Sequence, residues 1–335
     1  MRTRLSNWFQ LNARTALIVG ALAALPLFLH AGFLNTRGGG DSPFLLFRLH
    51  QLLTALGAGQ FPARWMPDAA YGLGYPFFHY YAALSFYIAA AFKLLGFSYV
   101  LALKLTQLAG FLAAAAGMYG WIRAASGSRP AAWLAAAAYT FAPFHMVNVY
   151  VRGDSLAEFW AMALFPLCLW AAHALTERAT LARVAAFAAS YGALVFTHNV
   201  SALIFTPLLL LYLAARSGRK LLPGVAGLAG GLALAAFFWA PALLEQDFAQ
   251  LAPVTEGYFH YANHFRAIDL LQTTLLFNYN VGSPDTTPFA MGILQAALTV
   301  LGLLALLLQV VVQRRNVRHA LFLGSMWALR CALAS

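Results

Sequence analysis

The chain has 335 residues, of which 62% are hydrophobic and only 9% charged, and its mean hydropathy is +0.70. Continuous apolar runs close to the roughly 20 residues that span a bilayer recur along it, which excludes a soluble globular protein and predicts spanning helices. The formal net charge of +11 comes from short Lys and Arg clusters between these runs, so we expect membrane topology and no nucleic-acid partner.

The apolar runs predict an all-α fold, a polytopic transmembrane helix bundle with about nine spanning helices and additional interfacial helices on the outer side. Lys and Arg in short loops favour the cytoplasm, which places the N-terminus and four basic loops there. The ten apolar segments are 15–34, 77–95, 101–122, 131–147, 156–175, 180–197, 200–215, 221–243, 289–312 and 318–333. The basic loops contain Arg123 and Arg129, then Arg178 and Arg183, then Arg216, Arg219 and Lys220, and finally Arg314, Arg315 and Arg318.

The segment 77–95 conflicts with this alternation. The first helix leaves the cytoplasm and 101–122 must return to it, so a single crossing by 77–95 does not fit between them. Its aromatic run "YPFFHYYAALSFY" is typical of interfacial segments, and we expect it to lie outside as a re-entrant or surface helix. The alternative is that it spans and another segment does not.

This topology leaves two long outer loops, 35–100 and 244–288, and loops of that length usually fold and carry function. The acidic residues gather with them, although the rule that places Lys and Arg says little about Asp and Glu. We therefore expect the chemistry of the protein on the outer face. Apart from Glu177, the acids expected there are Asp41, Asp68, Asp154, Glu158, Glu245, Asp247, Glu256, Asp269 and Asp285.

The stretch "NVYVRGDSLAEFW" places three charges at the edge of an apolar run. Ser155 and Glu158 have the spacing of a capping box, which with Asp154 would explain the acids as a helix start. Arg152 is poorly placed at the positive end of a helix unless it binds an anion or an acid. The second interpretation is that Arg152 holds a phosphate while Asp154 or Glu158 orients a polar substrate or a metal.

Asp41 follows the glycines of "TRGGGDSPFLLFRLHQLL" and precedes an amphipathic helix that should lie on the membrane surface. It is either the start of that helix or an acid placed at the lipid–water boundary. In "FPARWMPDAAYGLGYPFFHYY", the residues Arg64, Trp65, Tyr75 and His79 form either an aromatic belt or a platform for a sugar and a phosphate.

Three further outer positions complete the candidates. "FTHNVS" places His198 and Asn199 in a very short turn, and "LLEQDF" places Glu245 and Asp247 at a helix end. Two carboxylates are weak evidence for a divalent cation such as Mg²⁺ or Mn²⁺, and no motif predicts structural zinc. Arg266 is a further candidate for binding phosphate.

The order of these motifs resembles the GT-C superfamily of membrane glycosyltransferases, with Asp41 and Asp154 at the positions of its two outer-loop acids. More narrowly, "LTALGAGQFPARWMPDAAYGLGYPFFHYY", "VRGDSLAEF", "FTHN" and "EQDF" are similar to the bacterial membrane family labelled 6-pyruvoyl-tetrahydropterin synthase-related, over roughly 15–310. The D-x-D pattern of some superfamily members is absent at both acids. Relatives continue beyond a run such as "WALRCALAS", so we expect a single membrane domain shortened at its C-terminus.

The resemblance implies transfer of a sugar from a polyprenyl-phosphate donor to an acceptor, at the outer face of a bacterial cytoplasmic membrane. It assigns catalysis to Asp41, with Asp154 and Glu158 beside it. Substrate binding falls to Arg64, Trp65, Tyr75, His79, Arg152, His198, Asn199, Glu245, Asp247 and Arg266. The alternatives are a transporter or flippase, which would need ionisable groups inside the helices and often broken helices, and a membrane scaffold.

Overall fold

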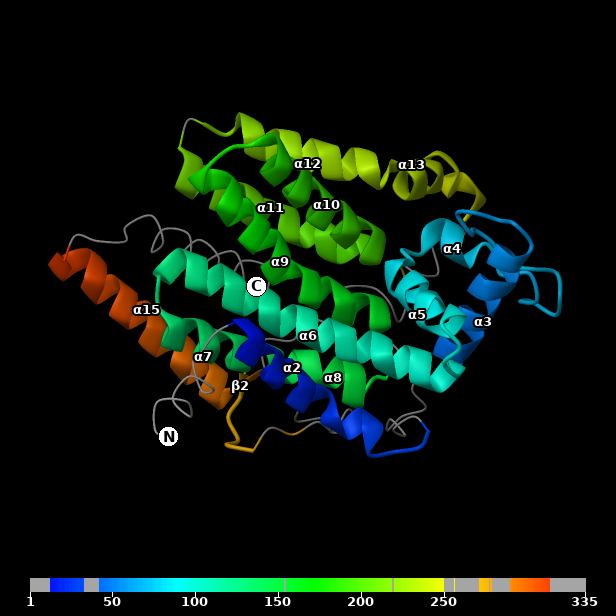
Figure 1. Ribbon diagram of the computed structural model, residues 1–335, viewed down its shortest axis with the longest axis horizontal. Helices are drawn as coiled ribbons and strands as arrows, with labels where there is room; N and C mark the ends of the chain where they lie inside the picture. Colours follow the sequence, from blue (N-terminus) through cyan, green and yellow to red (C-terminus); the bar gives the residue numbers. More distant parts are fainter. Residues whose placement is uncertain are drawn as a thin grey trace, which may run out of the picture.

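The computed structural model describes residues 13–32, 42–153, 155–218, 220–249, 256, 271–276, 278 and 290–313. This part of the chain is mostly helical, and the helices lie side by side in an elongated bundle (Figure 1). The predicted helical membrane class is confirmed. The described residues also include a short parallel strand pair, β1 (Leu271–Gln272) and β2 (Met291–Gly292).

Two long helices form the centre of the bundle, α6 (Tyr99–Ser126) and α9 (Leu156–Glu177). Gly127 ends α6 in the left-handed region at φ 72°, which a residue with a Cβ adopts only at a cost. Gly110 of α6 lets α9 approach α6 closely, because a Cβ at this position would lie 2.3 Å from Phe159 Cε1.

A second layer covers α9 and consists of α10 (Leu181–Thr197), α11 (Asn199–Ser217) and α12 (Leu222–Leu234). The chain then bends by 68° into α13 (Ala236–Leu244). Figure 1 shows α12 and α13 running along one side of the bundle until α13 reaches α4, which it contacts. The bent pair of α12 and α13 therefore brings the start of the loop 244–288 into contact with the loop 35–100.

The first long loop folds into α3 (Ser42–Gly57), the single turn α4 (Phe77–Tyr80) and α5 (Leu84–Leu94). Helix α5 has 11 residues. At about 1.5 Å per residue it covers about 16 Å, roughly half of the hydrocarbon core. This length agrees with the expectation that 77–95 does not cross the membrane.

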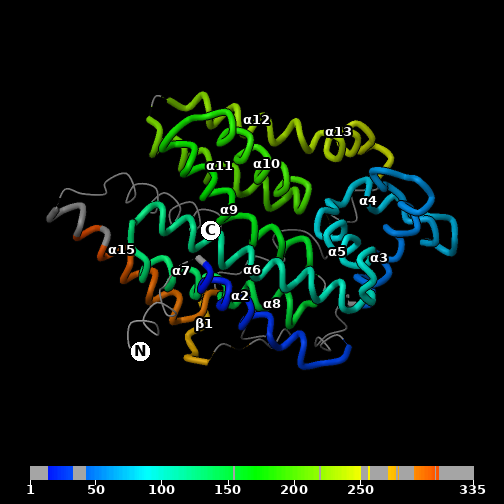
Figure 2. The backbone as a smooth tube through the Cα atoms, in the orientation of Figure 1, coloured from blue at the N-terminus to red at the C-terminus, as the bar shows by residue number. Residues whose placement is uncertain are grey.

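The segment expected as one apolar helix over 131–147 is two helices, α7 (Arg129–Thr140) and α8 (Pro143–Tyr150). The expectation of one helix was wrong because Pro143 holds the preceding Ala142 in an extended conformation, at φ −56° and ψ 136°. The other described elements are α2 (Ala13–Phe28), the 3₁₀ turn η1 (Gln246–Phe248) and α15 (Ile293–Gln313). Helix α15 lies at the end of the molecule away from α3 and α5 (Figure 2).

Among the described residues, α6, α9 and α11 are long and apolar enough to cross a membrane. The bent pair of α12 and α13 makes a fourth crossing if it counts as one span. The number of about nine spanning helices stays a prediction.

Candidate functional site at the acidic end of the bundle

A cluster of arginines lies at one end of the helices, whereas Glu158 and Glu245 lie at the other end together with Arg64 and Arg152. The C-terminal ends of α6, α9 and α11 lie close together, as shown by Ala124, Glu177 and Arg216, which line one pocket. We call this the arginine-rich end, since it carries Arg123, Arg178, Arg183 and Arg216. Glu158 lies in the first turn of α9 and Glu245 follows α13, so both occupy the other end. This second end, with Asp68 and Asp247, is called the acidic end.

The loop before α4 is held in shape by its own backbone. Met66 and Tyr75 form an antiparallel bridge with two backbone hydrogen bonds of 2.8 and 3.0 Å. Gly74, at φ 84°, is tightly covered, because a Cβ there would lie 1.8 Å from Trp65 Nε1. Trp65 and Tyr75 nevertheless stay 43% and 54% exposed, so their aromatic surfaces are available to a ligand.

Asp68 ties this loop to α3. Its backbone N–H donates to Gln51 Oε1 at 2.8 Å, and Gln51 Nε2 donates to Asp68 Oδ2 at 2.8 Å. The reciprocal pair satisfies the buried amide of Gln51. Asp68 therefore has a structural role, because it holds this loop against α3.

Arg64, His79 and Glu245 converge from three segments. Arg64 Nη2 donates to the carbonyl oxygen of Phe237 at 2.9 Å, and its Nη1 lies 3.4 Å from His79 Nδ1. His79 Nε2 lies 3.2 Å from Glu245 Oε2, close enough for an ion pair although not aligned as a hydrogen bond. Tyr80 adds a hydrogen bond of 2.7 Å from its hydroxyl to the backbone oxygen of Glu245.

The contacts of His79 fix where its proton lies. A guanidinium only donates, so Nδ1 of His79 must accept from Arg64. A neutral His79 then carries its proton on Nε2, which faces the Glu245 carboxylate. The side chain of His79 is buried, whereas that of Glu245 is 52% exposed, so the Glu245 carboxylate contacts His79 and is also accessible at the surface.

Arg152 and Glu158 form the second polar group of the acidic end. Arg152 Nη1 donates to Glu158 Oε2 at 2.6 Å and to Asn148 Oδ1 at 3.1 Å. Ser155 is the N-cap of α9, but its side chain makes no capping hydrogen bond. The capping-box interpretation is therefore wrong for Ser155, and the acid that Arg152 was expected to need is Glu158.

His198 lies beside this ion pair. Its Nδ1 accepts from the backbone N–H of Ser201 at 3.2 Å and so caps the start of α11. Burial lowers the pKa of His198 below its ordinary value; Glu158 opposes the shift and Arg152 adds to it. His198 is thus neutral near pH 7, and because its Nδ1 accepts a hydrogen bond, its proton lies on Nε2.

Aromatic side chains lie in contact between the segments that carry the two polar groups. Phe196 packs against Tyr87 and Phe237, with ring centroids 5.7 and 4.9 Å apart. Tyr87 accepts a hydrogen bond of 2.9 Å from Ala63 N, next to Arg64. Ala63 is the chain neighbour of Arg64, and Phe196 precedes His198 by two residues, so these contacts connect the segments that carry the two polar groups.

An apolar groove of about 700 Å³ opens beside Glu245. It runs between α10, α11 and the bent pair of α12 and α13, and Tyr80 and Gln246 close its polar end. Trp239 Nε1 donates to the carbonyl oxygen of Leu232 at 2.8 Å, a group that an unbroken helix would pair with residue 236. The indole thus stabilises the break that shapes the groove.

A protein-family model described as a 6-pyruvoyl-tetrahydropterin synthase related domain, a membrane protein, matches residues 78–269, which is more than half of the chain. The chain belongs to this family of membrane proteins. No curated protein and no solved structure matches it. The region matched by the 6-pyruvoyl-tetrahydropterin synthase related model contains His79, Arg152, Glu158, His198 and Glu245, together with the groove.

In this member of the 6-pyruvoyl-tetrahydropterin synthase related family, the structure brings together part of the predicted site. Arg64, His79 and Glu245 form one group, and Arg152, Glu158 and His198 form the other. Asn199 lies on the groove, whereas Asp247 is exposed in η1. The proposed catalytic acids Asp41 and Asp154, together with Arg266, lie outside the described residues.

Sequence reasoning missed several partners in this family member. Tyr80 and Asn148 orient Glu245 and Arg152, but nothing in their local sequence distinguishes them from other apolar-segment residues. Lys104 is buried in α6 and donates to the backbone oxygen of His30. A lysine inside an apolar run is itself a signal, because such a charge is costly in a membrane and usually has a partner.

The described residues do not fit a Mg²⁺ or Mn²⁺ site. Glu245 faces His79, and no three His, Cys, Asp or Glu side chains in the described ranges are grouped to hold a metal ion. Oxygen-rich coordination would be needed for either cation. The roles proposed below therefore use side chains alone.

Proposed function

We propose that the protein is a membrane glycosyltransferase that moves a sugar from a polyprenyl-phosphate donor to an acceptor at the outer face of the cytoplasmic membrane. The observation that carries this proposal is the apolar groove of about 700 Å³ whose lining includes Tyr80 and Gln246. These residues are the chain neighbours of His79 and Glu245, which meet each other, and His79 also meets Arg64. A lipid-linked donor needs such a pair of surfaces, one apolar for the chain and one cationic for its phosphate.

Arg64 suits the phosphate better than Arg152. Among the described residues, no carboxylate lies within ion-pair distance of Arg64, whose contacts are a carbonyl oxygen and a histidine nitrogen. Arg152 instead forms an ion pair with Glu158, which neutralises its charge. We therefore assign the donor phosphate to Arg64, with the exposed aromatic residues Trp65 and Tyr75 beside it to pack against the sugar.

In the proposed reaction, a hydroxyl oxygen of the acceptor bonds to the anomeric carbon of the sugar. The bond from that carbon to the phosphate oxygen breaks, and polyprenyl phosphate leaves with the electron pair. The hydroxyl proton passes to a carboxylate base, a role we propose for Asp41. Arg64 stabilises the charge that develops on the departing phosphate. Arg152, Glu158 and His198 would position the acceptor.

A flippase for a lipid-linked or anionic solute is the second candidate, and one observation favours it. The break between α12 and α13 is the kind of discontinuity that lines transport paths. Such a protein would move the lipid across the membrane without breaking its bond to the sugar. The same groove would serve both functions, so the chemical step distinguishes them.

The test is transfer of radiolabelled sugar from polyprenyl-phosphate donors in membranes that contain matched amounts of each variant. We expect Asp41→Asn to lower kcat by about 100-fold or more, because the base is lost. Arg64→Ala should lower kcat/KM by about 100-fold, because the leaving phosphate loses its cation.

Controls come from exposed charges away from the groups assigned here. Arg129→Ala, at the arginine-rich end, and Glu256→Gln, in the second outer loop, should leave transfer unchanged. Transfer that is indifferent to Asp41→Asn would overturn the assignment of the base. Movement of the labelled lipid across sealed vesicles without any glycosylated product would favour the flippase.

A further inference from the structure

A polar cavity, distinct from the apolar groove, lies at the arginine-rich end of the bundle, opposite the proposed active site. It has a volume of about 300 Å³ and is lined by small residues of α6, by the last turn of α9, and by Arg183 and Arg216. That volume is at the lower end of the range for small-ligand sites. Nothing in the proposed transfer reaction uses it.

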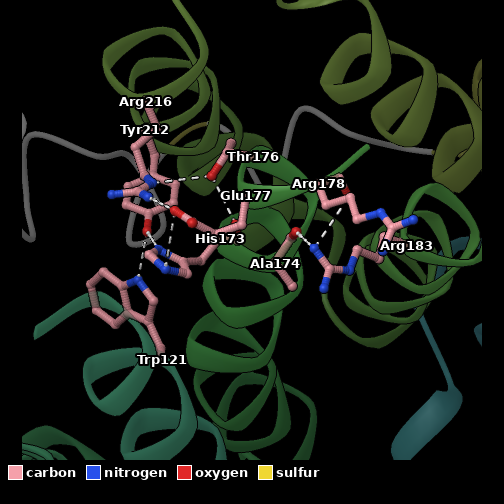
Figure 3. Close-up of polar contacts among 9 residues, drawn as sticks. All are labelled: Trp121, His173, Ala174, Thr176, Glu177, Arg178, Arg183, Tyr212 and Arg216. Atoms are coloured by element: carbon pink, nitrogen blue, oxygen red, sulfur yellow. Dashed lines mark hydrogen bonds and ion pairs between the residues drawn. The ribbon is translucent and has the colours of Figure 1, made fainter. Parts of the chain in front are cut away.

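A network of hydrogen bonds supports one wall of this cavity, to which it contributes His173, Glu177 and Arg216. The hydroxyl of Tyr212 lies 2.7 Å from His173 Nδ1 and accepts from Trp121 Nε1 at 3.0 Å, which joins α6, α9 and α11 (Figure 3). Arg216 Nη2 donates to Glu177, whose Oε1 also lies 3.9 Å from His173 Nε2. The network holds Arg216 in place and neutralises Glu177, the one carboxylate among the described residues that line the cavity.

Arg183 approaches the same turn from α10 (Figure 3). Its Nη1 donates to the backbone oxygens of Ala174 at 2.6 Å and of Arg178 at 3.3 Å. A guanidinium has five N–H donors, and within the described residues only this nitrogen of Arg183 is engaged. No carboxylate lies within ion-pair distance of it there.

We infer that this cavity binds the phosphate group of an anionic lipid. With His173 neutral, its lining residues carry two arginines and one glutamate that is already paired, so a positive charge remains on Arg183. The cavity opens between membrane helices at the arginine-rich end, the kind of basic pocket that receives anionic head groups. The planar guanidinium matches two phosphate oxygens at once.

The test is ligand binding by the purified full chain in neutral detergent, measured by native mass spectrometry. The three probes are phosphatidylglycerol, phosphatidylcholine and inorganic phosphate. We expect phosphatidylglycerol to bind more tightly than phosphatidylcholine, and Arg183→Gln to weaken it by about tenfold, the loss of one charge-assisted hydrogen bond. Arg129→Gln, an exposed arginine at the same end that does not line the cavity, should bind like the wild type.

A second variant separates binding from folding. Ala124→Trp fills the cavity from an exposed position of α6 without removing an arginine, and it should also weaken phosphatidylglycerol about tenfold. Inorganic phosphate that binds in an Arg183-dependent way, without preference for phosphatidylglycerol, would replace the lipid with a soluble phosphate as ligand. Equal phosphatidylglycerol binding by the wild type and by both cavity variants would overturn the proposal. Neither result depends on whether the protein transfers sugars.

Discussion

His79 shows how single residues at the acidic end are tuned. Its Nδ1 receives a hydrogen bond from Arg64, so its proton faces Glu245, and a change at either neighbour alters what His79 can donate. The difference between Arg64 and Arg152 has the same origin: the acceptor that each arginine meets decides how much of its charge is left for a ligand.

Gly74 and Gly72 provide a matched test of the loop that carries Arg64. Both have φ 84°, but a Cβ on Gly72 meets open space, whereas one on Gly74 meets Trp65. The left-handed backbone costs alanine roughly 1–2 kcal/mol at either position. We expect Gly74→Ala to lower the Tm further than Gly72→Ala and to shift the tryptophan fluorescence, as measured on the purified protein. Equal changes would show that Trp65 does not pack on Gly74.

His198 gives a pH dependence with a definite sign. Burial lowers its pKa, so the unfolded chain takes up the proton near pH 6.5 while the folded chain does so only at lower pH. The stabilisation is therefore complete above pH 6.5 and is lost as the pH falls below it. In thermal unfolding between pH 5 and 8, the Tm of His198→Gln should fall less steeply with decreasing pH than the Tm of the wild type. A steeper decline would contradict the assignment.

At the scale of elements, breaks in helices shape the groove and the loops around it. Pro143 ends the continuity of α7 and α8, and the bend after α12 turns α13 toward α4. Contact of α13 with α4 places Glu245 beside His79, although the two residues are far apart in the sequence. The position of the bend between α12 and α13 thus determines the shape of the groove.

Filling the groove tests its proposed role. Leu203 lies on it and is 74% exposed, while Leu210 on the same helix is 44% exposed and lies elsewhere. Leu203→Trp should reduce photo-crosslinking of a polyprenyl-phosphate probe by about tenfold, because the apolar chain loses its space. Leu210→Trp should crosslink like the wild type. Undiminished crosslinking in Leu203→Trp would remove the groove from the donor site.

At the scale of the whole molecule, a cluster of arginines distinguishes one end of the helices from the other, where arginines and acids are mixed. Arginines occupy the shared ends of α6, α9 and α11, whereas Glu158 and Glu245 occupy the other end. In a membrane this asymmetry orients the protein, since basic loops are retained in the cytoplasm. We therefore predict that the proposed active site faces outward and that the cavity at the arginine-rich end faces the cytoplasm.

The orientation can be measured with single cysteines. In a Cys331→Ser background, where Cys168 is buried, Gln246→Cys reports on the acidic end and Arg129→Cys on the arginine-rich end. A membrane-impermeant maleimide applied to intact spheroplasts should label Gln246→Cys and should label Arg129→Cys only after lysis. The reverse pattern would invert the topology and place the proposed site in the cytoplasm.

The sequence by itself determined the helical membrane class and predicted a surface segment at 77–95, because bilayer thickness and the cost of buried backbone limit what an apolar run can do. It also pointed to the outer loops as the place of the site. Only the tertiary structure decided which arginine keeps its charge: the acceptor of Arg64 is a carbonyl 173 residues away, and that of Arg152 is Glu158 in place of a helix cap. Local sequence does not encode such contacts, because they depend on where distant helices bend and end.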